Sequence, residues 1–213
     1  VNRPTEYVVV RDNLTRRGGG IVSFGSETSG DIRNVVALNN RGIGTQEGIR
    51  FKSARTRGGV VEDVLVRGVR MENVPIVVSF NSNWNPSYSY ATLPEDMKNI
   101  PEHWIVMNEP VRPERRGWPE FRNITIEGIE ATGADRFIAA QGLETTPLHG
   151  IHLEDISVQT RAAGSIRHAR DWTMRNVSVT TADGAGVDLR DSENVELPDI
   201  LTRTQTDSPI RPL

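Results

Sequence analysis

The sequence predicts an all-β fold in which short strands stack in parallel as the coils of a solenoid, a parallel β-helix. The main observation is a series of short apolar runs, each introduced by a leading residue that is polar or turn-forming. The first leading residues recur at similar intervals, 27 residues from Tyr7 to Asn34 and 29 from Asn34 to Asp63. The series continues, after a longer gap, at Asn123, Gly150, Asn176 and Asn194. A repeat in the twenties is typical of such coils.

A second set of short strands follows the first at a fixed offset of 13 to 15 residues. Its members are residues 21–24, 49–51, 76–78, 138–140 and 165–167. No segment keeps a 3.6-residue period, so we expect no helix of consequence. A β-sandwich also has many short strands, but it does not keep so regular a period. Each coil exposes an apolar face that it cannot bury alone, so stability is expected to come from stacking on neighbouring coils.

Composition predicts a single domain over residues 1–213, with no metal and no cofactor indicated. The formal net charge of -3 is too small to indicate nucleic acid or a membrane surface as a partner. Cysteine is absent, which excludes a disulfide framework and thiol chemistry, and no apolar run reaches the roughly 18 residues of a membrane span. Because the chain starts at Val1 without Met or a signal segment, we expect a processed or truncated product.

Two cations stand out in the strand predicted at residues 48–52. Apolar Ile49 and Phe51 alternate with Arg50 and Lys52, the period of a strand with one buried and one wet face. Arg50 and Lys52 then project from the same face, roughly 7 Å apart, and need an anionic partner or free solvation. Two interpretations are open at this point, a solvated polar face or a clamp for a carboxylate or phosphate.

Three Asn residues match the N-glycosylation pattern, Asn13, Asn123 and Asn176. Two of them, Asn123 and Asn176, are leading residues of the repeat. We favour a structural role for these, in which Asn bonds neighbouring backbone or stacks on an equivalent Asn in the next coil.

Residues 18–27, 28–35, 49–52 and 57–59 form local motifs that follow one another in a specific order. Together they resemble the C-terminal half of glycoside hydrolase family 28, the polygalacturonases. Residues 18–27, Gly-Gly-Gly-Ile-Val-Ser-Phe-Gly-Ser-Glu, look like the family's Gly-His-Gly strand that ends in Gly-Ser, and residues 28–35 are similar to the segment after it. Ile49-Arg50-Phe51-Lys52 corresponds to the family's Arg-Ile-Lys motif, and Arg57-Gly58-Gly59 to the following turn. The long insertion and residues 117–124 look most like the bacterial, exo-acting branch.

The resemblance implies a right-handed, pectin-lyase-like β-helix truncated at its N-terminal end, and hydrolysis of α-1,4 galacturonide bonds in pectin with inversion. The implied partners are pectin, polygalacturonate or oligogalacturonides, and the implied location is secreted or periplasmic. By the same resemblance, Arg50 and Lys52 hold the substrate carboxylate. With them we expect Arg57, Trp84 and Tyr88 to bind substrate, and the open first strand to favour end-to-end self-association.

Two departures from the family bear on catalysis. The family's catalytic His falls near Gly18, where this sequence has no His. The family's catalytic aspartates belong to coils that would precede residue 1. We therefore identify no catalytic residue in this chain and expect little or no hydrolysis by it alone.

The insertion at about residues 80–119 contains Trp84, Trp104, Trp118 and Tyr88. Long irregular loops inside a compact domain are usually functional or disordered, and three Trp argue against disorder. Two interpretations are open: a small core that packs the loop onto the solenoid, or a wall beside a groove with rings for stacking on sugar faces.

Other functions on the same fold remain hypotheses. A non-catalytic polysaccharide-binding β-helix or a spike-type structural β-helix fits the departure at Gly18. A pectate lyase would need a carboxylate cluster for calcium. Glu27, Asp31 and Glu47 are scattered, and we expect each to be a turn or surface residue.

Overall fold

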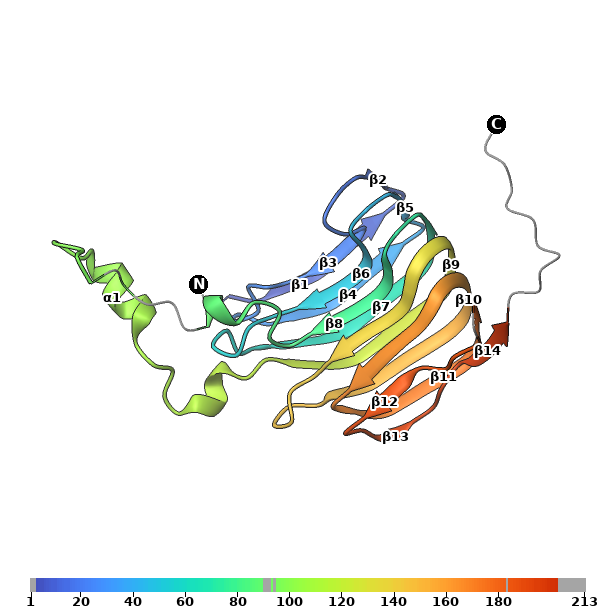
Figure 1. Cartoon of the computed structure of the whole chain (residues 1–213). Coiled ribbons are helices and arrows are strands. Elements are labelled where there is room, and N and C mark those ends of the chain that lie inside the picture. The colour runs from blue at the N-terminus through green and yellow to red at the C-terminus, as the bar shows by residue number, and fades with distance from the viewer. Residues whose placement is uncertain (1–2, 90–92, 94, 183, 203–213) are drawn as a thin grey trace.

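The computed structural model describes residues 3–89, 93, 95–182 and 184–202, and these residues form a right-handed parallel β-helix (Figure 1). Every strand pair is parallel, and each partner comes from a neighbouring coil. The strands are β1 (Thr5–Arg11), β2 (Leu14–Arg16), β3 (Val22–Phe24), β4 (Ile32–Leu38), β5 (Arg41–Ile43), β6 (Glu47–Lys52), β7 (Val60–Glu72), β8 (Ile76–Asn81), β9 (Glu120–Gln141), β10 (Leu148–Arg167), β11 (Ala169–Thr181), β12 (Asp188–Arg190), β13 (Glu193–Val195) and β14 (Asp199–Thr202).

The strands stack in three ladders, because each coil turns corners between successive strands. The first ladder runs β1–β4–β7–β9–β10–β11–β13. A second begins with β2 and β5 and continues through later parts of β7, β9, β10 and β11 to β14. The third contains β3, β6, β8, the C-terminal parts of β9 and β10, and β12. The fold predicted from the repeat is therefore confirmed.

The leading residues of the repeat are corners with left-handed backbone. Tyr7, Asn34, Asp63 and Asn123 have φ between 51° and 57°, and Gly150 has φ of 61°. This conformation costs most L-residues about 1–2 kcal/mol, whereas Gly, Asn and Asp adopt it readily, which explains the residue types at these positions. The leading residues therefore recur because each coil needs a residue that tolerates positive φ at this corner.

The predicted order of leading residues is wrong at Asn176. Residues 170 and 193 pair in register, as do 172 and 195, and these pairs align Asn194 with Asp171. Asn176 instead lies beside Asp155, and its Nδ2 donates to Asp155 Oδ1 at 2.7 Å. Both corners take Asn or Asp at positive φ, so a local apolar run does not distinguish one corner from the next. The stacking of Asn on a neighbouring corner side chain is nevertheless observed here.

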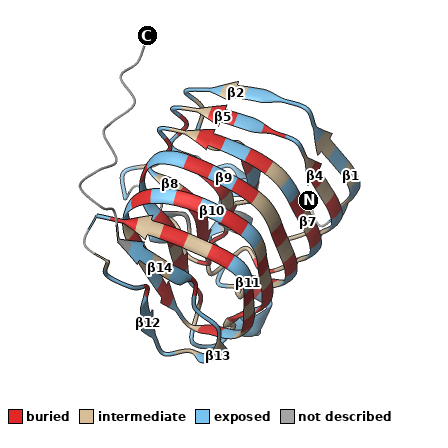
Figure 2. Ribbon diagram, turned by 90° about the vertical axis from the view of Figure 1, so that its right-hand side faces the viewer, coloured by how far each residue is buried: buried red, intermediate tan, exposed pale blue. Residues whose placement is uncertain are grey.

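Burial alternates along the strands and leaves a narrow apolar interior (Figure 2). Phe24, Phe51 and Phe80 stack face to face, with ring centroids 4.5 and 4.6 Å apart. Phe121 and Trp172 meet Phe80 edge-on, and Trp172 Nε1 donates to the carbonyl of Leu148. The stack lies directly beneath the third ladder, so it gives that face a rigid floor.

The insertion lies between β8 and β9 and leaves the solenoid wall at one end of the third ladder (Figure 1). It contains the short helices η1 (Pro86–Tyr88), α1 (Glu102–Asn108) and η2 (Glu114–Gly117). The sequence patterns did not predict α1, because its seven residues are too few to show a 3.6-residue period. Pro101 lies at its N-cap. Trp104 on α1 is 43% exposed, so this ring is not the centre of a packed core. No helix in the described part of the chain is long and apolar enough to cross a membrane.

Candidate functional site

The third ladder presents two rows of side chains on its outer face. Register pairs Arg50 with Ser23 on one side and Ser79 on the other, and the row ends at Asp188. The second row starts at Lys52, two residues further along β6. Row 50 consists of Ser23, Arg50, Ser79, Ala139, Ser165 and Asp188, and row 52 of Lys52, Asn81, Gln141, Arg167 and Arg190. Neighbouring members of a row lie one coil apart, about 4.8 Å.

Arg50 and Lys52 lie side by side as the alternation predicted. Ile49, which precedes Arg50, and Phe51, which lies between the two cations, are fully buried, while Arg50 and Lys52 face outward. Trp84 lies against both, with its ring centroid 5.4 Å from Arg50 Cζ and 4.2 Å from Lys52 Nζ. Both cation–π contacts favour a fixed geometry, each worth about 0.5–2 kcal/mol depending on solvation. We call Arg50, Lys52 and Trp84 the clamp.

Trp84 is held in place by its own backbone. Its N–H donates to the carbonyl of Ser53 at 3.0 Å, and the preceding Asn83 N–H donates to Asn81 Oδ1 at 3.0 Å. The first turn of the insertion is therefore fastened to the ends of β6 and β8. Trp84 thus lies beside the face of Arg50 and Lys52, and the stacking of its ring on a sugar stays a prediction.

Glu47 is not the turn or surface residue that we expected. It lies on β6, and its Oε1 is 3.1 Å from Arg50 Nε, with both side chains less than 20% exposed. Its other oxygen bonds the hydroxyl of Ser79 on the next coil. The strand alternation breaks at Gly48, where Gly48 and Ile49 are both buried, so Glu47 falls on the face of Arg50. A Cβ on Gly48 would meet Met71 and the carbonyl of Val77, so only glycine fits there.

The pKa of Lys52 is lowered from its usual value. Burial is the largest cause, because it removes water from the ammonium group, and repulsion by Arg50 is the next. Glu47 and Glu27 act in the opposite direction. An anion placed beside Lys52 would oppose the repulsion by Arg50 and raise this pKa.

Beside the clamp lies a hollow of about 210 Å³. Its lining includes Arg50 and Trp84, the carboxylate of Glu47, and polar groups from the next coils. Those polar groups are Ser79, Asn81, Gln141 and Ser165. A floor of apolar rings, a few hydrogen-bonding side chains and a cation next to a Trp face suit an anionic sugar, whose ring stacks and whose carboxylate pairs.

Two comparisons with known proteins match most of the chain. A probable polygalacturonase from Vitis vinifera is 26% identical over 176 residues, which is 82% of this chain and 31% of the relative. The crystal structure of a hyperthermoactive exopolygalacturonase from Thermotoga maritima matches 88% of this chain with a TM-score of 0.54 and 25% identity. This chain is related to the polygalacturonases. It spans about a third of the length of these relatives, 31% and 35% respectively.

Two further results concern the extent of the match. A methionyl-tRNA formyltransferase from Streptomyces avermitilis is 30% identical over 95 residues, but this match covers only 44% of the chain. No family model matches the chain. The polygalacturonase relationship therefore rests on the two matches that span more than four-fifths of the β-helix.

The remaining residues predicted for this polygalacturonase relative lie near the clamp or outside the described side chains. Arg57 is in the turn after β6 and pairs with Glu27 at 2.8 Å. Glu27 also raises the pKa of Lys52, whereas Arg57 does not line the hollow. Tyr88 belongs to η1, and its side chain lies outside the described residues.

The turn that carries Arg57 depends on close backbone contacts. Gly59 has φ of 75°, and a Cβ there would collide with the carbonyl of Thr28. Thr28, fully buried, donates its hydroxyl to the carbonyl of Gly58 and bonds Ser53 Oγ at 2.7 Å. These contacts fasten the turn to the preceding coil and so fix the C-terminal end of the clamp strand.

Gly18 lies in the bend between β2 and β3, where its carbonyl accepts from the N–H of Gln46. A glycine supplies no titratable group, so this position cannot take the part of the family's His. The other acids considered for calcium are dispersed: Asp31 accepts from the N–H of Val60, and Glu27 pairs with Arg57. Within the described residues no group of three or more His, Cys, Asp or Glu side chains is arranged to hold a metal ion.

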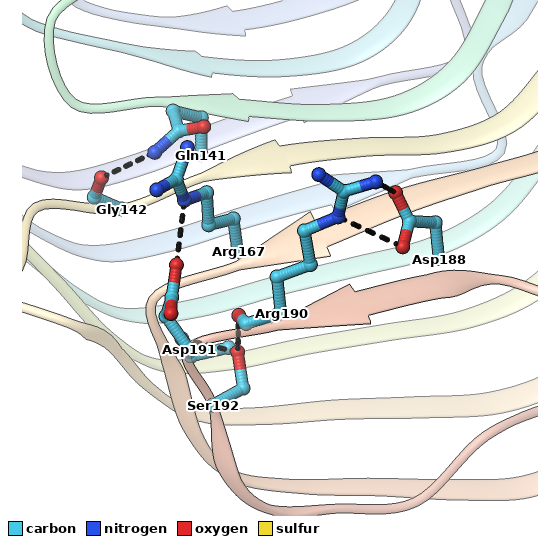
Figure 3. A network of polar contacts seen from close by, with 8 residues as sticks. Gln141, Gly142, Arg167, Asp188, Arg190, Asp191 and Ser192 are labelled. Atoms are coloured by element: carbon cyan, nitrogen blue, oxygen red, sulfur yellow. Dashed lines mark hydrogen bonds and ion pairs between the residues drawn. The ribbon is translucent and has the colours of Figure 1, made fainter.

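A second hollow, of about 600 Å³, lies at the end of row 52 and is lined by Arg167, Arg170, Asp191 and Glu193 among others. Figure 3 shows Arg167 pairing with Asp191 at 2.8 Å and Arg190 making a two-pronged contact with Asp188. Each arginine in this region thus has a carboxylate from the same or the next strand. The sequence patterns singled out none of these residues for a site. The observed register places Arg167 and Arg190 on row 52 and Asp188 on row 50.

Proposed function

We propose that this chain binds galacturonate units of pectin at the clamp, as part of a polygalacturonase-type glycoside hydrolase that cleaves α-1,4 galacturonide bonds with inversion. The observation that carries the proposal is the side-by-side placement of Arg50 and Lys52 under the ring of Trp84. Arg50 forms a charge-assisted pair with the uronate carboxylate, and Lys52 reaches the same group or a neighbouring hydroxyl. Trp84 supplies an apolar wall for the ring.

The closeness of Arg50 and Lys52 to one another supports this assignment. Burial is the main cause of the lowered pKa of Lys52 and repulsion by Arg50 is the second, and a ligand carboxylate beside both cations gains attraction from each. The relatives named as polygalacturonases support the substrate class, since galacturonate carries one carboxylate on every ring.

Catalysis by inversion requires two carboxyl groups about 6.5–9.5 Å apart, one to protonate the leaving oxygen and one to activate water. Among the described residues that line the hollow, Glu47 is the single carboxylate, and it is paired with Arg50. We therefore expect this chain by itself to bind oligogalacturonides with little or no hydrolysis, because loss of an acid or base typically costs about 10²–10⁴-fold in rate.

Two measurements on the same preparation test the proposal. Calorimetric titration with trigalacturonate and with a neutral galactose trisaccharide should show binding of the acidic sugar and weak or no binding of the neutral one. Incubation with polygalacturonate should release few reducing ends. Equal affinity for both sugars would exclude uronate recognition, and rapid release of reducing ends would show that the acid and base are present in this chain.

A second candidate function is a non-catalytic polysaccharide-binding β-helix. The glycine at position 18, in place of a titratable side chain, favours it. It shares the clamp with the hydrolase and differs only in the acid and base. The carboxylates encoded in the adjoining coils of the gene decide between the two: an Asn-Thr-Asp segment with an Asp-Asp pair supports the hydrolase, and their absence supports the binding module.

A secreted or periplasmic location belongs to the same proposal, since pectin lies outside the cell. We also propose that β1 mediates end-to-end association. Tyr7 and Val9 on this strand are 78% and 63% exposed, and β1 pairs with β4 on one edge only in the described structure. Size-exclusion chromatography over a range of concentrations checks this, with a concentration-independent monomer as the contrary outcome.

A further inference from the structure

Glu47 brings a negative charge into a clamp that is built to attract one. Its carboxylate is 17% exposed and lies between Arg50 Nε, at 3.1 Å, and the hydroxyl of Ser79. Such a charge weakens the attraction for a ligand carboxylate, and uronate binding alone does not require it. The same face could hold Arg50 against Trp84 without any acid.

The charges around the clamp show what Glu47 does. Arg50 and Lys52 contribute two positive charges, and Glu47 reduces the sum to one. Glu27 also influences Lys52, but its side chain is 72% exposed and is paired with Arg57, so its charge is compensated. The clamp and Glu47 together therefore carry one net positive charge. Arg50 and Glu47 line the hollow, and Lys52 lies beside it, 4.2 Å from the ring centroid of Trp84.

We propose that Glu47 is the specificity-determining residue of the clamp, and that its charge restricts the site to ligands with a single negative charge, a uronate, over dianionic sugars such as sugar phosphates. This inference rests on the proposed function. One net positive charge neutralises one carboxylate. A second charge on the ligand would lose its water without gaining a partner, and the cost of desolvation rises steeply with charge.

The proposal predicts that the gain in affinity on removing Glu47 increases with the negative charge of the ligand. Coulomb attraction is proportional to the charge of the ligand, so removing Glu47 should multiply the affinity for a monoanion by one factor and that for a dianion by about its square. For a partly screened charge at this range, a factor of roughly fivefold is reasonable, and thus roughly 25-fold for the dianion. A neutral sugar should show no change.

Three ligands with the same ring test this: galactose, galacturonate and galactose 6-phosphate, whose charge near C6 is zero, one and about two. The probe is the 13Cε signal of Lys52 at pH 7.5, since Lys52 and Lys98 are the two lysines of the chain and Lys98 is an exposed internal control. Titrations of wild type and Glu47→Gln should show graded gains of none, roughly fivefold and roughly 25-fold.

Glu62→Gln is the matched control. Glu62 is equally buried at 18% exposure and pairs with Arg122 at 2.8 Å, but on the first ladder. It should leave all three affinities unchanged. If Glu47→Gln changes all three ligands by the same factor, or none of them, Glu47 has only a structural role and the inference is wrong.

The outcomes separate this inference from the proposed function. A wild type that prefers galacturonate to galactose, with no graded gain in Glu47→Gln, overturns the inference alone. A wild type without that preference, but with a graded gain in the variant, overturns uronate recognition and leaves Glu47 as the charge-setting residue. Should Glu47→Gln not fold, the exposed Gln141→Glu adds a carboxylate to the same hollow and should give graded losses in the same order; equal losses would contradict the inference.

Discussion

Two groups of cations on the third ladder differ in how their charges are compensated. At the clamp, Arg50 and Lys52 lie beside one carboxylate, Glu47, which pairs with Arg50. At the far end of row 52, Arg167 pairs with Asp191 and Arg190 with Asp188, and of these four residues Arg167 and Asp191 line the second hollow. The clamp is thus left with one net positive charge, whereas at the far end each arginine has its own carboxylate.

An arginine on these rows is therefore not expected to bind an anion merely because it faces outward. Arg167 and Arg190 occupy the same row as Lys52, and the stacking of coils presents them in the same direction. What distinguishes the clamp is that the neighbouring strands offer it Ser23, Ser79 and Asn81 in place of acids. On the excess of charge, together with the ring of Trp84, we assign the proposed anion site to the clamp.

The largest effect is expected from removing the arginine of the clamp. Arg50→Ala should weaken trigalacturonate binding about 10- to 100-fold, the equivalent of about 1.5–3 kcal/mol for a charge-assisted hydrogen bond, without changing the affinity for a neutral trisaccharide. Arg190→Ala is the control, because Arg190 is paired with Asp188, and it should change the affinity for neither sugar. Calorimetry with both sugars measures this, and equal loss for the two sugars would mean that Arg50 only supports the fold.

A smaller effect is expected from the aromatic wall. Trp84→Ala removes the ring from Arg50 and Lys52 and should weaken trigalacturonate about two- to fivefold, in line with about 0.5–1 kcal/mol for a cation–π contact. Trp104→Ala, on the exposed face of α1, is the control and should have no effect. Intrinsic fluorescence titration is sufficient, and a larger loss from Trp104→Ala would place the sugar on the helix of the insertion.

The second hollow should become an anion site when its acids are neutralised. The double variant Asp188→Asn, Asp191→Asn leaves Arg167 and Arg190 without counter-charges and should strengthen binding of longer oligogalacturonides about two- to fivefold, because exposed ion pairs are worth up to about 1 kcal/mol. Single galacturonate units should be unaffected, since they occupy the clamp alone. A series of oligomers of increasing length distinguishes the two effects, and an unchanged profile would show that charge compensation is not what separates the hollows.

The smallest effect is a shift in titration. The pKa of Lys52 should lie below the ordinary lysine value of 10.5, and galacturonate should raise it by placing an anion beside the ammonium group. Because the pKa of Lys52 is lower folded than unfolded, the unfolded chain binds more protons between the folded pKa and 10.5. Stability should therefore rise with pH across that window, and the rise should be smaller in Lys52→Met. Lysine NMR and thermal melts from pH 8 to 10.5 test both, and a Lys52 pKa at or above 10.5 would contradict the account.

The position of the cations could be predicted from the sequence because it follows from a local rule. Ile49 and Phe51 are apolar and must point inward, so Arg50 and Lys52 point outward whatever the rest of the chain does. The repeat itself is equally local, since the corners at Asn34, Asp63 and Asn123 need residues that accept positive φ.

Glu47 could not be predicted in the same way. Strict alternation places it on the same side as Ile49, opposite Arg50, and it is the pair of consecutive buried residues at Gly48 that moves it to the outer face. That pair exists because Met71 and Val77 of other strands approach Gly48 closely. Likewise, the contact of Trp84 with the clamp depends on hydrogen bonds from the insertion to the ends of β6 and β8.

The sequence by itself determined the solenoid, its corners and the outward direction of Arg50 and Lys52, because each depends on residues close together in the chain. Only the tertiary structure decided which charges compensate one another. Coil stacking brings together side chains some 20 to 60 residues apart, such as Glu47 with Ser79 and Arg167 with Asp191. The net charge at each group of cations depends on side chains from several coils, so it cannot be worked out from one strand of the sequence.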